Sequence, residues 1–203
     1  DLHYFPFCRG RIFDSLENDD QQYDYDVPVT WTSGAAMLIR SNLFHQVKGF
    51  DSDFFAHMEE IDLCIRLGNL GFDFHCVPES TVYHLGGGTL DYDSPKKVYL
   101  NFRNSLFMLI KNHAGLLFPS LFIRMCLDGI AGVKFLLSGK FQLTWMVFLA
   151  HMNVYAQFGR FYKKRRQINT KARKFYRYNG RIIWDYYFLK NTVYSQLNKR
   201  KFN

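Results

Sequence analysis

The chain has 203 residues, of which 48% are hydrophobic and 22% are charged, and this composition excludes an intrinsically disordered protein. Its length allows one domain with a sizeable core, or a small domain with an appendage. The net charge of +8 is uneven, because residues 1–160 carry 13 Lys/Arg against 17 Asp/Glu, whereas residues 161–203 carry 13 against one. A basic tail on an acidic body predicts contact with an anionic membrane surface; a solvated tail and nucleic-acid binding are the alternatives.

Three strands and three helices are expected in the first 112 residues, after an acidic, loop-like start. The strands follow from β-branched composition or alternation and are expected at residues 27–32, 72–77 and 81–85. A short helix is expected at residues 43–47 with Ser41 or Asn42 as its cap, and an amphipathic helix at residues 56–70 with Gly71 as its stop. The third helix starts at Pro95 and carries an apolar stripe: Tyr99, Phe102, Leu106, Leu109 and Ile110.

Residues 113–203 form a second expected region, amphipathic, helical and basic. The longest run without formal charge, residues 141–159, is marginal in length for a membrane span and too polar. Helices that lie in the membrane interface fit better, since Trp145 and many Phe residues precede the basic run at residues 163–166. The alternative is a helical hairpin packed on the preceding region, residues 1–112, and both descriptions are compatible.

The four cysteines lack C-x-x-C spacing and lie in apolar sequence contexts: Cys8, Cys64, Cys76 and Cys126. We therefore expect reduced core thiols, as in a cytosolic protein. The chain shows no signal peptide and does not begin with Met, so we expect it to be part of a longer polypeptide.

The most informative stretch contains three acids and an arginine within an apolar pattern: Glu59, Glu60, Asp62 and Arg66. Acids at this density are costly to bury without a task or a partner. The i, i+4 spacing of Asp62 and Arg66 is typical of a structural ion pair. For Glu59 and Glu60 the structural alternative is a solvated helix start, where the helix dipole favours acids.

Ordered landmarks surround this stretch: Trp31-Thr32-Ser33-Gly34-Ala35, Gly49-Phe50-Asp51, Gly71-Phe72, Pro78-Glu79-Ser80, Val82-Tyr83-His84 and Arg103-Asn104. In that order they resemble the C-terminal half of a family 2 glycosyltransferase, of the inverting, nucleotide-sugar-dependent kind, and in particular bacterial rhamnosyltransferase-like enzymes of envelope polysaccharide synthesis. The resemblance implies an α/β fold class: the acceptor-side part of a GT-A (Rossmann-like) domain, residues 1–112, followed by an α-helical, membrane-apposed C-terminal extension.

The resemblance also implies roles for individual residues. Glu60 stands where the family has its general base, usually an Asp, and Glu59 is then a supporting acid. The other implied site residues are His84 for the metal, Gly86, Gly87 and Arg103 for the donor diphosphate, and Trp31, Ser33 and Gly34 for the acceptor. Each of these residues also has a structural alternative. His84 can be a structural histidine with its hydrogen bonds satisfied, and the glycines can form a hinge. Arg103 can brace the helix that carries the base, and Trp31 can be a core residue with Gly34 at a tight turn.

The family's Asp-x-Asp metal motif is expected upstream of Trp31. Three strings in this chain match it, none after an apolar strand, and we interpret them as chance matches: residues 24–26, 51–53 and 91–93. We therefore expect the nucleotide-binding half to be missing, the divalent metal site (Mn or Mg) to be incomplete, and this chain alone to be inactive.

The expected function is inverting sugar transfer from a nucleotide-sugar to a saccharide or polyprenyl-linked acceptor. The expected location is cytoplasmic, peripheral on the inner face of the cytoplasmic membrane. The alternative is a non-catalytic membrane-surface or scaffold module that retains part of the fold. Nucleic-acid binding is disfavoured, since no recognised nucleic-acid motif occurs.

Overall fold

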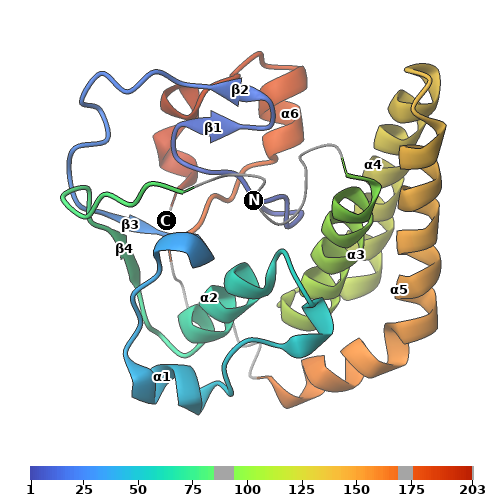
Figure 1. Ribbon diagram of the computed structural model, residues 1–203, viewed down its shortest axis with the longest axis horizontal. Coiled ribbons are helices and arrows are strands. Elements are labelled where there is room, and N and C mark those ends of the chain that lie inside the picture. The colour runs from blue at the N-terminus through green and yellow to red at the C-terminus, as the bar shows by residue number, and fades with distance from the viewer. Residues whose placement is uncertain (85–93, 169–175, 203) are drawn as a thin grey trace.

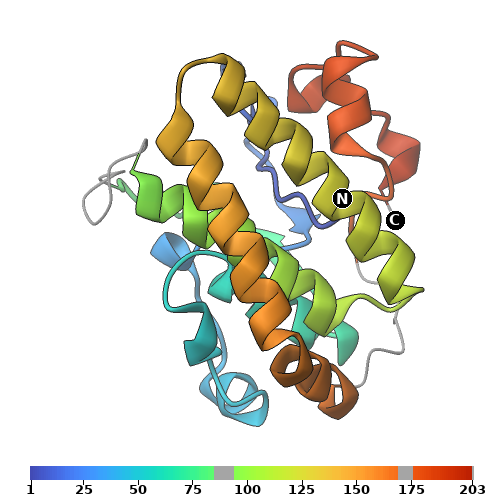
Figure 2. The same cartoon turned by 90° about the vertical axis from the view of Figure 1, so that its right-hand side faces the viewer.

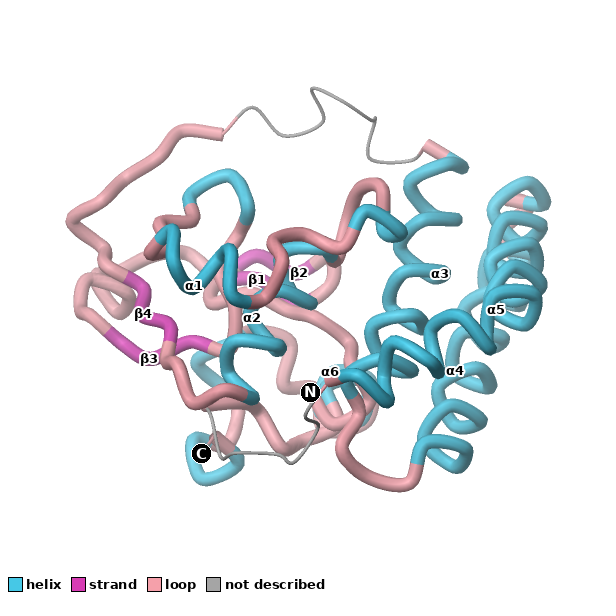
Figure 3. The backbone as a smooth tube through the Cα atoms, turned by 90° about the horizontal axis from the view of Figure 1, so that it is seen from below, coloured by secondary structure: helices cyan, strands magenta, loops and turns pink. Residues whose placement is uncertain are grey.

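The computed structural model describes residues 1–84, 94–168 and 176–202. Its strands are β1 (Arg11–Ile12), β2 (Ser15–Leu16), β3 (Val27–Val29) and β4 (Phe74–Cys76). Its α-helices are α1 (Ser41–Gln46), α2 (Glu59–Asn69), α3 (Pro95–Asn112), α4 (Leu117–Leu137), α5 (Phe141–Gln167) and α6 (Ile182–Tyr187), with short 3₁₀ turns between them. The fold is mixed α/β and mostly helical (Figure 1). Figure 3 separates the helical side, α3 to α5, from the loop-rich side that holds β3 and β4.

Two small antiparallel sheets lie within the described ranges, β1 with β2 and β3 with β4. In the second sheet Val27 pairs with Cys76 and Val29 with Phe74, so the predicted strands at 27–32 and 72–77 exist but are shorter. The strand predicted at 81–85 is wrong for residues 81–84, which are exposed and irregular; Leu85 lies outside the described residues. Local sequence pattern alone predicted that strand, and without burial of one face such a segment gains no packing.

Helix α2 begins at Glu59, three residues later than predicted. The cause is the backbone before it, because Phe55, His57 and Met58 all have positive φ, between 64° and 72°, which a right-handed helix excludes. The cap predicted for the first helix is also wrong. Arg40 precedes α1 and provides no side-chain cap.

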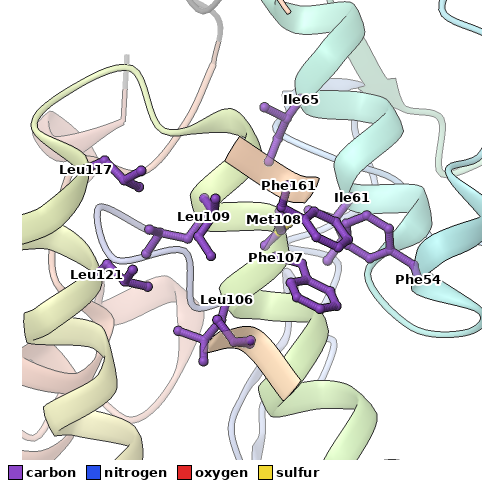
Figure 4. Packing of buried hydrophobic residues seen from close by; sticks show 12 residues of the cluster. Phe54, Ile61, Ile65, Leu106, Phe107, Met108, Leu109, Leu117, Leu121 and Phe161 are labelled. Carbon is purple, nitrogen blue, oxygen red and sulfur yellow. The ribbon is translucent and has the colours of Figure 1, made fainter. Parts of the chain in front are cut away.

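The core forms where α3 packs against α5, with α4 beside them (Figure 2). Phe107 of α3 stacks on Phe161 of α5 with ring centroids 3.7 Å apart, and Phe54 meets Phe161 edge-on at 6.1 Å (Figure 4). Each fully buried Phe side chain contributes about 2–3 kcal/mol. The α4–α5 hairpin thus shares one core with the preceding residues, as the packed-hairpin alternative describes.

The C-terminal residues return to the N-terminal ones. Ile12 of β1 lies in a second cluster with Tyr178, Ile182 and Leu197, and all four are buried. The Leu2 amide donates to the Gly180 carbonyl at 3.1 Å, so the N-terminal residues lie against the C-terminal segment (Figure 2). Much of the basic tail is therefore folded structure.

Within the described ranges, none of the helices combines the length and the apolar character needed to cross a membrane.

The cysteines are all free thiols. Cys64 is buried in α2 and Cys76 is half-buried in β4. The expectation of core thiols is wrong for Cys8 and Cys126, which are exposed. An apolar sequence context misled here, because the apolar face around Cys126 of α4 points outward.

Candidate functional site

A pocket of about 180 Å³ opens at the start of α2. Segments far apart in the sequence line it: Pro6, Phe7, Cys8, Trp31, His57, Met58, Glu60, Ile61 and Asn101. The fold thus brings Trp31 and Glu60, two residues singled out from the sequence, to one pocket.

Glu60 is an acid on the pocket wall with a shifted pKa. Burial raises its pKa above the usual glutamate range, and the negative charge of Glu59 adds to this. Its Oε2 atom is buried, as is that of Glu59, and neither atom has a hydrogen-bond partner among the described residues. A desolvated carboxylate oxygen without a partner is stabilised when a hydroxyl group enters the pocket and donates a hydrogen bond to it. A general base needs this contact with the proton that it removes.

The Trp31 segment runs along the first turns of α2. A Cβ atom added at Gly34 would lie 3.8 Å from the Glu60 Cβ, and the Thr32 hydroxyl lies 4.0 Å from the Cys64 sulfur. The Ser33 hydroxyl accepts a hydrogen bond from the Ala35 amide at 3.3 Å, and it thereby caps the short 3₁₀ turn that follows it. Trp31 also packs against the main core and so combines the core role with a place on the pocket wall.

Asn104 clamps the loop that leads into α2. Its Nδ2 atom lies 2.9 Å from the Phe54 carbonyl oxygen, 2.7 Å from that of Ala56 and 2.8 Å from that of His57. Nδ2 carries only two hydrogens, so the three acceptors share them. The carbonyls converge because the backbone has positive φ at Phe55 and His57, a conformation that costs free energy and needs outside support.

Arg103 completes the clamp. Its Nε donates to Asn104 Oδ1 at 2.9 Å and its Nη2 donates to the Phe54 carbonyl at 3.0 Å. These contacts describe the bracing role that the sequence left open for Arg103; binding of a donor diphosphate stays a prediction. Asn104 was noted in the sequence only as the neighbour of Arg103, and that adjacency was the one signal for its role.

His57 was missed from the sequence. Its ring lines the pocket beside Glu60, and burial, followed by the positive charge of Lys97, lowers its pKa, so the ring is neutral near pH 7. Its Nε2 atom is buried without a hydrogen-bond partner among the described residues. A neutral imidazole of this kind can donate to or accept from a bound hydroxyl group.

The predicted pair of Asp62 and Arg66 is present, with Nε to Oδ2 at 2.8 Å, and it belongs to a larger buried network. Lys111 Nζ lies 2.8 Å from Asp62 Oδ2, and Asn112 Nδ2 donates to Asp62 Oδ1 at 2.7 Å. Arg66 also donates to the carbonyls of Val47 and Gly49. Asp62 is therefore fully satisfied and structural.

The Asp-x-Asp string at residues 51–53 connects to α5. Lys164 Nζ contacts Asp51 at 2.6 Å and Asp53 at 2.5 Å, and Arg160 contacts Asp53 at 2.5 Å. Burial alone would raise the pKa of Asp51, but hydrogen bonds from Lys111 and Lys164 outweigh it and lower the value to about 2. In the string at residues 24–26, the Asp26 carboxylate contacts His75 at 2.9 Å, and the string at residues 91–93 lies outside the described residues.

His84, the predicted metal ligand, is exposed, and Gly86 and Gly87 lie outside the described residues. In the part of the chain that the structure describes, no three His, Cys, Asp or Glu side chains come together to hold a metal ion. His84 and the other described residues do not by themselves fit a divalent metal site. We therefore assign no chemical step to a metal held by them.

Comparison with known proteins identifies relatives of one activity. The chain is 34% identical over 110 residues to N-acetylglucosaminyl-diphospho-decaprenol L-rhamnosyltransferase of Mycobacterium tuberculosis, covering 54% of this chain and 36% of the relative. It is 42% identical over 59 residues to rhamnosyltransferase WbbL of Escherichia coli, covering 29% and 22%. It is 25% identical over 126 residues to dTDP-rhamnosyl transferase RfbF of Shigella flexneri, covering 57% and 42%.

No family model and no solved structure matches the chain. The chain spans less than half the length of the curated relatives it matches. The relatives confirm the resemblance to bacterial rhamnosyltransferases and are consistent with a family 2 glycosyltransferase.

Proposed function

We propose that this chain, similar to bacterial rhamnosyltransferases, is the acceptor-side part of an inverting glycosyltransferase in which Glu60 is the general base. The observation that carries the proposal is the Glu60 carboxylate, half-buried beside Trp31 with a raised pKa and an unpartnered oxygen. The Glu60 carboxylate takes the proton of an acceptor hydroxyl group while that oxygen forms the new bond to the anomeric carbon. The bond from that carbon to the nucleotide diphosphate breaks, and the diphosphate leaves with the electron pair.

The surroundings of Glu60 suit this step. A base works best when its pKa approaches the working pH, and burial moves the pKa of Glu60 in that direction. The neutral His57 ring can hold the acceptor hydroxyl group or its neighbour, and the half-buried Trp31 ring can stack on a sugar face. The clamp of Arg103 and Asn104 fixes the loop whose end sets the position of Glu60.

The names of the relatives indicate the substrates we propose. They point to a dTDP-rhamnose donor and to an acceptor saccharide linked through a diphosphate to a polyprenol. We place the reaction in envelope polysaccharide synthesis, on the cytoplasmic face of the membrane. A divalent metal at the donor diphosphate, with His84 as a ligand and Gly86, Gly87 and Arg103 nearby, rests on the resemblance alone.

The test is Glu60→Gln in the full-length protein, assayed for rhamnose transfer from dTDP-rhamnose to an N-acetylglucosaminyl-diphospho-polyprenol acceptor. We expect kcat to fall by about 10²–10⁴-fold without any loss of thermal stability beyond about 1 kcal/mol. Glu59→Gln is the matched control, with the same chemical change one position earlier, and should cost less than about tenfold. Full activity of Glu60→Gln, or an equal loss in both variants, would overturn the assignment of the base.

The pH profile gives a second readout. A base must be deprotonated to act, so kcat/KM falls as the pH falls through the pKa of Glu60. Since that pKa is raised, we expect the midpoint of the acidic limb of the pH profile to lie above the ordinary glutamate pKa of about 4.3. A limb at or below that value would show that the carboxylate is not desolvated in the free enzyme.

A further inference from the structure

We propose that the outward face of α4 and α5 docks on an anionic lipid surface, with these two long helices lying along it. We call this surface the outer face and define it by Phe118, Phe122 and Ile130 of α4 and Trp145, Phe148 and Tyr155 of α5. The inference does not depend on catalysis by Glu60, so either proposal can fail without the other.

The first observation is that α5 is apolar on two sides, of which the core uses one. Leu143, Val147, Ala150 and Val154 are buried at helical spacing. On the opposite side Trp145, Phe148 and Tyr155 recur at spacings of three and seven residues, and Trp145 remains 55% exposed. A stripe of large apolar side chains in water is costly and signals an interaction site.

Helix α4 repeats the pattern. Leu117, Leu121, Arg124, Asp128 and Gly132 point inward, whereas Phe118, Phe122 and Ile130 point outward, with Phe122 70% exposed. Figure 2 shows α4 and α5 side by side on the outside of α3, so the two exposed stripes belong to one side of the molecule. The Lys134 ammonium lies 5.9 Å from the Tyr187 ring centroid, which links α4 to the exposed aromatic residues of α6.

Charge decides which partner fits the outer face. Residues 113–168 contain a single acid, Asp128, and it is 1% exposed and paired with Arg124 at 3.0 Å. Exposed cations stand around the apolar stripes: Lys134, Lys140, Lys163 and Arg166. A second copy of this face would set like charges against one another, whereas anionic headgroups complement the cations and acyl chains accept the aromatic rings.

The structure also corrects which basic residues are available. In the run at residues 163–166, Lys164 forms ion pairs with Asp51 and Asp53. Arg165 donates hydrogen bonds to the carbonyls of His113 and Ile110. Lys163 and Arg166 are exposed. Neutralising the whole run would therefore disturb the fold and the surface charge together, and a clean test uses Lys163 and Arg166 alone.

The experiment is co-sedimentation of the full-length protein with vesicles of phosphatidylcholine containing phosphatidylglycerol, and with vesicles of phosphatidylcholine alone. We expect Phe122→Ser with Phe148→Ser to weaken binding about tenfold or more. Lys163→Gln with Arg166→Gln should weaken binding to the anionic vesicles about tenfold and reduce its salt dependence. The matched control, Leu38→Ser with Arg40→Gln, removes an exposed apolar and a basic residue near α1 and should change binding by less than about twofold.

Cys126 supplies a direct probe, because it is exposed on α4. It should react with a soluble thiol reagent in the free protein and become protected on anionic vesicles, while Cys8, exposed outside the outer face, stays reactive. The proposal fails if the outer-face and control variants bind alike. It also fails if Cys126 is unreactive in the free protein, or if the Phe variant changes the oligomeric state and leaves vesicle binding unchanged.

Discussion

Glu60 and Asp62 lie two positions apart on the same helix, yet their surroundings are opposite. Asp62 is fully buried and contacts Arg66, Lys111 and Asn112. Glu60 is half-buried, has a buried oxygen without a partner among the described residues, and has a raised pKa. The satisfied acid stabilises the fold, and the unsatisfied acid remains free to react. Sequence proximity alone would not separate the two acids; the difference in burial and in the number of partners does.

The largest expected effect is on Asp62. Asp62→Asn removes the charge that balances Arg66 and Lys111 in a buried site, and we expect the free energy of unfolding in urea to fall by about 3–5 kcal/mol. Glu60→Gln, the companion substitution, should leave that free energy within about 1 kcal/mol of the parent or raise it. Equal losses in the two variants would remove the distinction between the two acids.

The second effect concerns the clamp. Asn104→Ala withdraws the donor shared by three carbonyls, and we expect it to cost about 2–3 kcal/mol of unfolding free energy, measured in urea. It should also shift the acidic limb of the pH profile of kcat/KM, because the clamped loop leads directly into α2, where Glu60 lies. Asn101→Ala, on the same helix at the pocket rim, is the control and should cost less than about 1 kcal/mol. If the acidic limb of the pH profile in Asn104→Ala matches that of the parent, Asn104 has a purely structural role.

The third effect is a pH dependence of stability. The pKa of Asp51 is lowered from 3.8 to about 2, so its ion pairs with Lys111 and Lys164 stabilise the fold above about pH 4 and are lost as the pH falls toward 2. The contribution is at most about 2.5 kcal/mol, and solvent screening reduces it. Urea unfolding across this window should show the decline in the parent and a flatter curve in Asp51→Asn. The same slope in both proteins would contradict the assignment.

The smallest effect is expected at Gly34. The added Cβ of Gly34→Ala would meet the Glu60 Cβ at 3.8 Å, an ordinary contact, so the free energy of unfolding should change by less than about 0.5 kcal/mol. If the segment borders the acceptor, KM for the acceptor should rise about twofold at constant kcat. A fall in kcat would place Gly34 closer to the reacting atoms than we propose.

Local patterns predicted most of the elements and the start of α3 at Pro95, but most of the other ends differ. The apolar periodicity of α3 and the alternation of β4 were sufficient to predict both, and the i, i+4 spacing anticipated the contact of Asp62 with Arg66. The start of α2 was missed because positive φ at ordinary residues leaves no sequence signal. Such a backbone is held by a side chain nearly 50 residues away, Asn104.

The sequence by itself determined the resemblance to rhamnosyltransferases, the acids of α2 and the basic character of the tail, since composition, spacing and motif order are properties of the chain alone. Only the tertiary structure decided which acid is satisfied, because Lys111 and Asn112 reach Asp62 from about 50 residues further along. It also decided which cations remain exposed, because Lys164 turns toward Asp51 and Asp53 while Lys163, its neighbour, faces water. Both outcomes depend on how far a side chain is removed from water and on which groups lie within hydrogen-bond reach, and these are set only when distant segments of the chain pack together.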